Sequence, residues 1–458
     1  MNELPETLDE TYERILKGIN KAQKDNAHRL LRCLTVAVRP LRVGELAEFL
    51  AFDFHASTTG GGLPTLKEDW RWDDEEEAVL STCSSLITII PHHYGDSRIV
   101  QFSHFSVKEF LTSHRLARSP HEDISRFRID LESAHTIMAQ ACLATLLRQS
   151  EHAGNSDSKK SPLVNYAAEH WVDHAQFGKV SSRVREGMDD IFDKSQPHFA
   201  AWLQVHDIDD DWNYFSPYLR NGVGSPLYYA ASCGFYDVAE CLILKYPEQV
   251  NSIGGRNLSP LPAALHKKHF RIANLLFKHG AVVVVRGHEA RTPMYTSSLT
   301  GSLDIMRWLL NHGADSNARS STRGTPLHIA AYNMDLNAVQ VLLEHNANPN
   351  LQNYYGRTPL HMVLINSDTS REGQRLVVTI VRQLLEHGAS PSKRDNHHTT
   401  PLHEASSRGR VEVVRLLLSY GVKVDDKDKS GRTPLQLAVS RGYSEIPKLL
   451  VERGAVPH

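Results

Sequence analysis

The chain contains 458 residues, of which 41% are hydrophobic and 23% are charged, and its formal net charge is −2. A chain of this length is too long for one ordinary hydrophobic core and predicts two or more domains. The nearly neutral charge excludes a general electrostatic attraction to nucleic acid or to an acidic membrane surface. No apolar run approaches the roughly 20 residues that cross a bilayer, so we expect no membrane-spanning segment.

The start of the chain and the cysteine pattern both favour a cytoplasmic location. Residues 1–5 contain neither the basic segment nor the apolar core of a secretion signal. An odd number of cysteines without C-x-x-C pairs is typical of free thiols in a reducing compartment. The five cysteines are Cys33, Cys83, Cys142, Cys233 and Cys241.

The first 121 residues are predicted to contain a helical lead-in (1–26) and a winged-helix-like domain (27–121). Apolar residues at helical spacing indicate the helices, and two β-branched runs joined by a turn indicate a hairpin. Three helices, a hairpin and a closing helix form the order of a winged helix. The predicted helices lie near residues 27–38, 43–52, 73–86 and 102–111, and the strands are 87–90 and 99–102.

A winged helix raises the possibility of DNA binding, but the charge of its third helix opposes it. Residues 67–77, which form this helix and its lead-in, contain two basic and seven acidic side chains. Binding DNA requires cations that displace counterions from phosphate, so this segment would repel DNA. We therefore expect the domain to pack within the molecule as a hinge or clamp and to bind no nucleic acid.

Residues 122–221 are predicted to form a helical stem with tryptophans in its core. Asp207, Asp209 and Asp211 alternate like the first ligands of a calcium loop, but Trp212 stands where such a loop needs glycine. We therefore interpret this stretch as an acidic loop without calcium. The expected helices are 133–147, 166–173 with Trp171, and 199–205 with Trp202, with a polar loop at 149–161.

The second half of the chain, residues 222–458, repeats one pattern seven times. Each unit begins with Ser or Thr, then proline, then an apolar residue, which suits a capped helix whose first position needs no N–H. A second apolar helix follows and ends at glycine or asparagine, the residue types of a left-handed C-cap. The motif prolines are separated by 34, 33, 33, 33, 42 and 33 residues: Pro226, Pro260, Pro293, Pro326, Pro359, Pro401 and Pro434.

This period, with Thr-Pro-Leu-His at the head of the best copies, resembles the ankyrin repeat. The resemblance implies an α-solenoid with β-hairpin loops, so the whole chain is expected to be mainly α. It also implies that His328, His361 and His403 brace neighbouring hairpins through hydrogen bonds. Nine extra residues near 366–374 are predicted to enlarge the turn between two helices.

Three segments of the first domain carry a second resemblance, to fungal NACHT–ankyrin proteins of the STAND class of signalling ATPases. They are L-P-x-T-L-x-x-x-Y-x-x-I-L at 4–16, R-P-L-x-x-x-E-L at 39–46 and F-x-H-x-S-V-x-E-F-L at 102–111. That family is ordered as nucleotide-binding domain, winged helix, helical stem and ankyrin array. The resemblance implies that the nucleotide-binding domain would lie before Met1.

The sequence offers no cofactor, metal or catalytic site. Phosphate binding by a P-loop requires G-x-x-x-x-G-K-[ST], and this motif is absent, so we expect no nucleotide site. His266 and His269 could share a metal, but no H-E-x-x-H motif and no Cys/His quartet accompanies them. No G-x-S-x-G motif or paired Cys and His indicates a nucleophile, so we expect no enzyme activity.

Function is therefore expected on the surface loops of a rigid scaffold, as binding of a protein partner. The ankyrin resemblance places binding at the hairpin tips and along the inner helices, and tyrosine and arginine are enriched at binding hot spots. A regulatory half of a STAND ATPase, acting with a nucleotide-binding domain outside this chain, remains the alternative. The candidate partner-binding residues are Arg319, Arg323, Tyr354, Tyr355, Arg357, His397, His398, Lys429 and Arg432.

Overall fold

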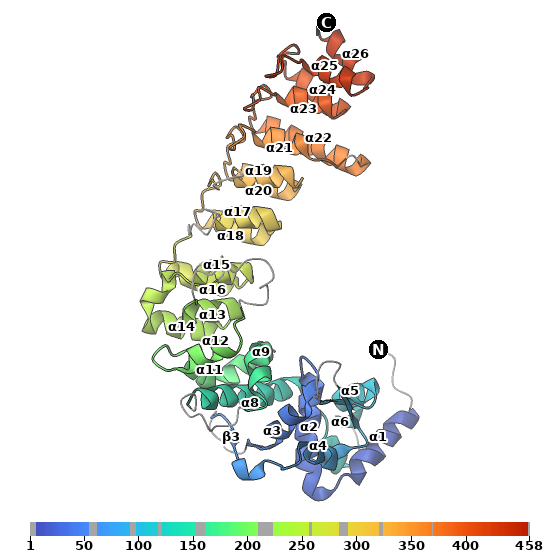
Figure 1. Cartoon of the computed structure of the whole chain (residues 1–458), viewed down its shortest axis with the longest axis vertical. Helices are drawn as coiled ribbons and strands as arrows, with labels where there is room; N and C mark the ends of the chain where they lie inside the picture. Colours follow the sequence, from blue (N-terminus) through green and yellow to red (C-terminus); the bar gives the residue numbers. More distant parts are fainter. Residues whose placement is uncertain are drawn as a thin grey trace. The chain divides into compact units, whose positions relative to one another are not determined.

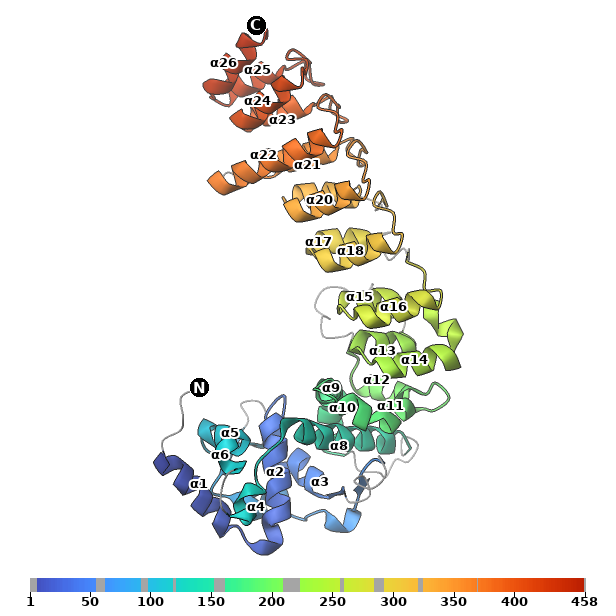
Figure 2. The same cartoon turned by 180° about the vertical axis from the view of Figure 1, so that it is seen from behind.

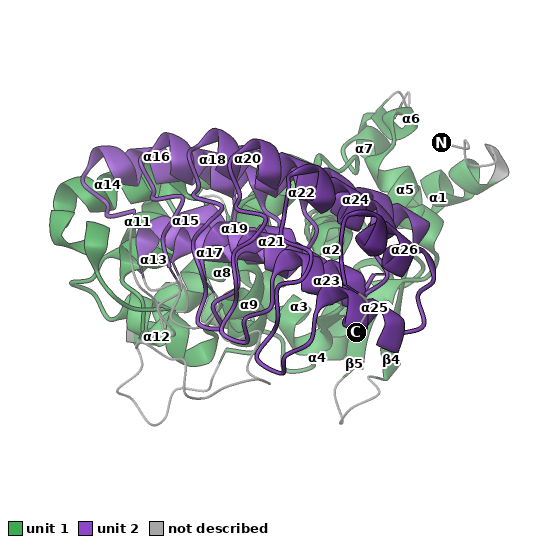
Figure 3. Cartoon of the chain, turned by 90° about the horizontal axis from the view of Figure 1, so that it is seen from above, with its two compact units in different colours: residues 1–256 green, residues 257–458 purple. Residues whose placement is uncertain are grey.

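The computed structural model is mainly helical, as predicted, and separates into two compact units, residues 1–256 and 257–458 (Figure 3). The first unit contains the predicted winged helix and stem together with the first helical pair of the repeat array. The limits of the four predicted domains stay predictions. The structure describes residues 6–54, 62–91, 98–117, 121–151, 161–208, 223–255, 259–283, 292–319, 324–368 and 370–456.

The first unit begins with a winged helix, which confirms the predicted element order. A three-stranded sheet of order β1-β5-β4 carries the wing, and Ile89 of β4 pairs with Val100 of β5. Strand β1 has only two residues, which is too short for a period-2 pattern, and sequence reasoning missed it. The elements are α1 (Glu6–Gly18), α2 (Lys24–Val36), β1 (Leu41–Arg42), α3 (Val43–Leu50), α4 (Glu75–Cys83), β4 (Ile87–Pro91), β5 (Arg98–Phe102) and α5 (Phe105–Thr112).

The domain also contains short strands and 3-10 helices. The two-residue strands β2 (Phe52–Asp53) and β3 (Thr65–Leu66) pair with each other, and the 3-10 helices are η1 (Lys21–Gln23) and η3 (Glu68–Trp70). The predicted turn at 94–97 lies outside the described residues.

The stem packs around a cluster of aromatic rings, which confirms the core role predicted for the tryptophans. Trp171 and Trp202 are fully buried with ring centroids 5.2 Å apart, and Trp171 stacks on Phe235 at 5.5 Å. Helices α7, α10 and α11 were not predicted. Helix α6 (His114–Ala117) precedes the stem, whose helices are α7 (Glu122–Ser125), α8 (Leu131–Glu151), α9 (Val164–Ala175), α10 (Val180–Arg183), α11 (Arg185–Phe192) and α12 (His198–Val205).

Phe235 belongs to the first repeat, so the aromatic cluster joins this repeat to the stem within one unit. The repeat comprises α13 (Pro226–Cys233), α14 (Tyr236–Lys245) and η5 (Pro247–Asn251).

In its described residues the second unit is a stack of six helical pairs, and from the second pair onward each first helix packs on the next first helix (Figures 1 and 2). Figure 3 shows the first and second helices as two separate purple rows. The pairs are α15 (Pro260–His266) with α16 (Phe270–Lys278), α17 (Pro293–Thr300) with α18 (Leu303–Asn311), α19 (Pro326–Tyr332) with α20 (Leu336–Glu344), α21 (Pro359–Ile365) with α22 (Arg371–Glu386), α23 (Pro401–Ser407) with α24 (Val411–Ser419), and α25 (Pro434–Ser440) with α26 (Glu445–Glu452).

Local chemistry sets the ends of these helices as predicted. Proline occupies the first turn of every first helix, and Thr325, Thr358 and Thr400 each form a capping box with the histidine three residues later. The second helices end at left-handed residues, including Asn346 with φ of 60°. Lys268 and Met334 replace the usual glycine between the paired helices and adopt its left-handed conformation themselves, with φ of 61° and 56°.

The nine-residue insertion does not simply enlarge a turn, which corrects the prediction. Most of it extends α22, which has 16 residues where α20 and α24 have nine. Ser370 caps this longer helix by accepting the backbone N–H of Gly373 at 3.0 Å. In Figure 1 the helix projects beyond its neighbours in the same row.

Candidate functional site

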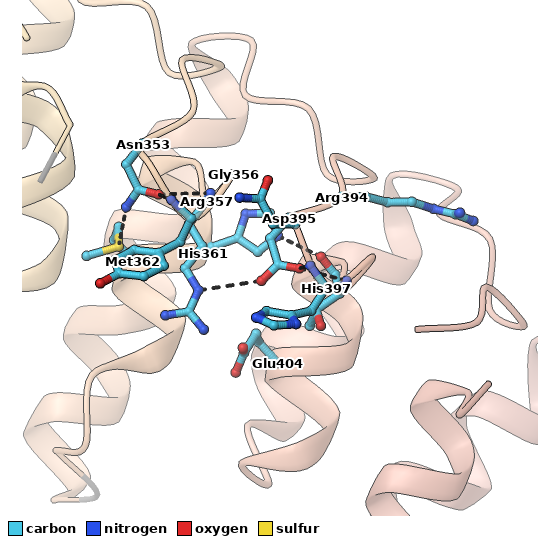
Figure 4. A network of polar contacts seen from close by, with 12 residues as sticks. Asn353, Gly356, Arg357, His361, Met362, Arg394, Asp395, His397 and Glu404 are labelled. Atoms are coloured by element: carbon cyan, nitrogen blue, oxygen red, sulfur yellow. Dashed lines mark hydrogen bonds and ion pairs between the residues drawn. The ribbon is translucent and has the colours of Figure 1, made fainter. Parts of the chain in front are cut away.

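Three successive hairpin turns of the second unit share one construction. In each turn, an Asn or Asp side chain accepts two backbone N–H groups through Oδ1, as Asn353 does from Tyr355 at 2.9 Å and from Arg357 at 3.1 Å. Asp395 and Asp428 repeat these contacts in the next two turns (Figure 4 shows the first two). These hydrogen bonds therefore fix the backbone that carries the exposed residues of each turn.

The turns are also joined to one another. The backbone N–H of Asn396 donates to the carbonyl of Tyr355 at 3.0 Å, and its side-chain amide donates to the carbonyl of Tyr354 at 3.0 Å. One turn later, the N–H of Lys429 donates to the carbonyl of His397 at 2.9 Å. Gly356 is required here, because its φ is +74° and a Cβ would lie 2.6 Å from the nitrogen of Asn396.

The motif histidines hold each turn against the preceding unit, which confirms their predicted bracing role. Nδ1 of His328 accepts the backbone N–H of Thr325 at 3.1 Å, and Nε2 lies 2.9 Å from the carbonyl of Arg357. These two contacts require a neutral ring that is protonated on Nε2. His361 and His403 repeat this arrangement with the carbonyls of Thr399 and Arg432.

Burial keeps these rings neutral. It lowers the pKa of His328 from 6.5 to about 4, and it lowers the pKa of His361 and of His403 as well. The hydrogen bonds of the three histidines are therefore intact at neutral pH, and protonation of the rings in acid weakens them.

The side chain of Arg357 forms an ion pair within the fold and is also partly exposed. Its Nε lies 3.5 Å from a carboxylate oxygen of the buried Asp395, and its guanidinium lies 6.0 Å from the centre of the Tyr355 ring. The side chain is 29% exposed. The ion pair with Asp395, a dashed line in Figure 4, thus orients Arg357 beside the tyrosine, and part of the charge still faces solvent.

Most predicted partner-binding residues are on the surface. Tyr354 and Tyr355 are the most open, at 78% and 56% exposure. Arg319 is exposed on the hairpin before α19, whereas Arg323 lies outside the described residues. The joined turns bring together the others, which are exposed except for the half-buried Arg357: Tyr354, Tyr355, Arg357, His397, His398, Lys429 and Arg432.

Sequence reasoning missed a second group, at the carboxyl ends of the first helices. Leu299 and Tyr332 are 38% and 45% exposed, and Ile365 is half-buried at the same place in the next unit. Each is the seventh residue counted from its motif proline. An apolar residue at one fixed position in successive units, beyond the buried alanines, is the signal that could have revealed them.

The segments that resemble NACHT–ankyrin proteins serve to assemble the first unit. Tyr12 Oη lies 2.7 Å from Ser106 Oγ, which lies 2.5 Å from Nδ1 of His104, so the opening and closing segments meet. Ser106 is fully buried and therefore not a nucleophile open to substrate. Within the middle segment, 39–46, Arg39 donates to both carboxylate oxygens of Glu45, at 2.9 and 2.7 Å.

A buried carboxylate joins the winged helix to the stem. Glu48 of α3, whose side chain is 3% exposed, accepts Arg71 at 2.5 Å, the hydroxyl of Ser161 at 2.5 Å and the backbone N–H of Leu163 at 2.9 Å. These contacts come from the loop before α4 and from the segment that leads into α9. Glu48 is thus a structural anchor in the interior.

The described residues contain no group of three or more His, Cys, Asp or Glu that could hold a metal ion. Nor does any helix among them have the length and apolar character needed to cross a membrane.

Comparisons with known proteins agree with this architecture. A model of ankyrin repeats matches three times, at residues 227–320, 294–395 and 372–458. A model of the winged helix domain of GPI inositol-deacylase matches residues 12–120.

A curated relative, azaphilone pigments biosynthesis cluster protein L of Monascus ruber, is 31% identical over 301 residues. The match covers 62% of this chain and 61% of that protein. Among solved structures, the ankyrin repeat domain of Bcl-3, a member of the IkappaB family, matches 50% of this chain and 99% of its own, at 25% identity and a TM-score of 0.44.

The ankyrin matches together extend over residues 227–458, which is half of the chain. The protein therefore belongs to the ankyrin-repeat family, and it carries in addition a winged helix domain of the type found in fungal NACHT proteins.

Proposed function

We propose that this protein is a non-enzymatic scaffold that binds a partner protein through the joined turns and the first-helix ends of its second unit. The exposure of Tyr354 and Tyr355 on a hydrogen-bonded turn is the main support. Tyrosines held in this way bury a large area on binding and lose little conformational entropy, because their backbone is already ordered. We place this binding in intracellular signalling or recognition, in keeping with five cysteines that form no disulfide.

Replacing both Tyr354 and Tyr355 by alanine is expected to weaken partner capture at least about tenfold, since hot-spot tyrosines contribute about 2 kcal/mol or more each. The wild-type chain and the double variant are used as matched baits, and the partner is followed by quantitative mass spectrometry. Both side chains are exposed, so the unfolding midpoint is expected to stay unchanged.

Tyr420→Ala is the matched control. Tyr420 is 45% exposed at the end of α24, in the row of second helices. Its removal is expected to leave capture unchanged. Equal capture by the wild type and the double variant would exclude the tyrosine turn as the contact.

A second candidate function is that of the regulatory half of a STAND ATPase. The match of residues 12–120 to a winged helix of the NACHT-associated type favours it. In this case the chain would bind a separate NACHT domain, and size-exclusion chromatography of the mixture with and without ADP tests for that complex. Separate elution under both conditions would contradict this candidate.

A further inference from the structure

Four residues of the first unit form one line of hydrogen bonds from the winged helix to the stem. The backbone N–H of Val38, which follows α2, donates to the hydroxyl oxygen of Tyr166 at 3.2 Å. The same hydroxyl lies 2.9 Å from Nε2 of His174, and Nδ1 of His174 lies 2.9 Å from Nδ1 of His135. Tyr166 and His174 belong to α9 and His135 belongs to α8, so the line crosses three segments of the chain.

Counting donors and acceptors assigns the protons along this line. Since the oxygen of Tyr166 accepts the N–H of Val38, the hydroxyl donates its own proton to Nε2 of His174. A neutral His174 ring then carries its proton on Nδ1 and donates it to Nδ1 of His135, whose own proton is on Nε2. The opposite assignment would leave the hydroxyl proton of the fully buried Tyr166 without an acceptor, which burial penalises.

His135 is the ring of this line that solvent reaches. Tyr166 and His174 are fully buried, whereas His135 is half-buried and its ring stacks on the exposed Phe177, with centroids 4.0 Å apart. Burial lowers the pKa of His174 to about 3. Burial also lowers the pKa of His135, and the positive charge of Lys108 in α5 lowers it further. Both rings are therefore neutral at pH 7.

The charged groups around the line do not favour a protonated His135. Lys108 opposes the second proton. Glu132, one turn before His135 on α8, is already paired with Arg183 of α10 at 2.6 Å. The groups whose charges act on His174 or Tyr166 are His170 and Asp173 of α9, Arg39 of the loop after α2, Cys33 of α2 and Cys142 of α8.

We propose that this line of hydrogen bonds is an acid-sensitive connection between the winged helix and the stem. A second proton on His135 turns its Nδ1 into a donor, which then faces the Nδ1–H donor of His174. His174 has to carry its proton on Nε2 or turn away, and in either case the hydroxyl proton of Tyr166 loses its acceptor. The attachment of Val38 to α9 is thereby weakened. This inference does not rest on the proposed function, which concerns the second unit.

The test is amide hydrogen exchange of the full chain, followed by mass spectrometry between pH 7.5 and 5.5. Each rate is compared with the intrinsic exchange rate at the same pH, and Val38 is followed in peptides that cover residues 36–41. We expect its protection to fall at least about threefold over this range, because a released His135 titrates near pH 6.5 and the hydrogen-bonded ring titrates lower. The connection is thus fully present above pH 6.5 and is lost as the pH falls through the lowered pKa.

Two variants locate the effect. His135→Asn keeps an acceptor at the place of Nδ1 but takes up no proton, so the protection of Val38 should stay within about twofold from pH 7.5 to 5.5. Tyr166→Phe removes the hydroxyl and should lower this protection about fivefold at pH 7.5 already. The matched control, His121→Asn, changes an exposed histidine directly before α7 and should keep the wild-type pH dependence.

Any of four results would overturn the inference: equal protection of Val38 at pH 7.5 and 5.5 in the wild type, an equal fall in the wild type and in His135→Asn, unchanged protection in Tyr166→Phe at pH 7.5, or a loss of protection at Leu163 as large as at Val38. The N–H of Leu163 is held by Glu48 without a histidine, so it reports a general loosening of the first unit. The two variants are independent tests, so if one of them fails to fold the other still decides.

Discussion

Replacing Glu48 by alanine is expected to destabilise the first unit by about 3 kcal/mol, since it removes one carboxylate on which three donors converge. Leu163 would keep a buried backbone N–H without an acceptor, and Arg71 would lose its buried partner. Amide hydrogen exchange should show faster opening of both α3 and α9, because the carboxylate joins the segments that hold them. The loss of free energy can be measured by urea unfolding.

Glu169→Ala is the control for this prediction. Glu169 lies 3.6 Å from Arg39, and its side chain is 39% exposed, so this ion pair is screened by water. Its removal is expected to cost less than about 1 kcal/mol. Equal effects of the two substitutions would show that Glu48 does not anchor the winged helix to the stem.

Acid is expected to destabilise the second unit through its bracing histidines. Burial lowers the pKa of His328 to about 4 in the folded chain, whereas the unfolded ring titrates near 6.5. The unfolded state therefore binds the extra proton first, and stability that is fully present above pH 6.5 is lost as the pH falls towards 4. This difference in pKa corresponds to about 3 kcal/mol for His328 alone.

The chain itself supplies the control residue for this titration. Gln436 occupies the equivalent position in the last unit, where its side-chain oxygen accepts the N–H of Thr433 at 3.0 Å. We expect His328→Gln to keep the capping box and to remove most of the acid dependence of hydrogen exchange in α19. An unchanged pH dependence in that helix would contradict the role given to His328. The measurement must be local, because burial also lowers the pKa of His28 and of His174 in the first unit.

The two units differ in the polar contacts on which they depend. The first unit depends on carboxylates such as Glu45 and Glu48, which are paired with arginines, in addition to its line of hydrogen bonds through two histidines. The second depends on neutral imidazoles repeated from unit to unit. Mild acid is therefore expected to loosen the turns that carry Tyr354 and Tyr355, and to weaken partner binding there before the apolar helix packing is lost.

The sequence by itself determined the features that depend on a few neighbouring residues. The proline period, the Thr caps and the left-handed C-caps were sufficient to locate all the helical pairs of the repeat array. The same local chemistry predicted the order of the winged helix. The fixed 33-residue period also led to one wrong prediction. It assigned the insertion to a turn, whereas residues 371–386 form a helix.

Only the tertiary structure determined which distant residues contact one another. Asn396 reaches the carbonyls of Tyr354 and Tyr355 across 42 and 41 residues, and Glu48 reaches Leu163 across 115. Such contacts depend on how repeats stack and how helices turn, and no local pattern encodes that geometry. The period therefore predicted a scaffold with exposed turns, whereas the stacking of the units joined these turns to one another and buried the carboxylates of Asp395 and Asp428.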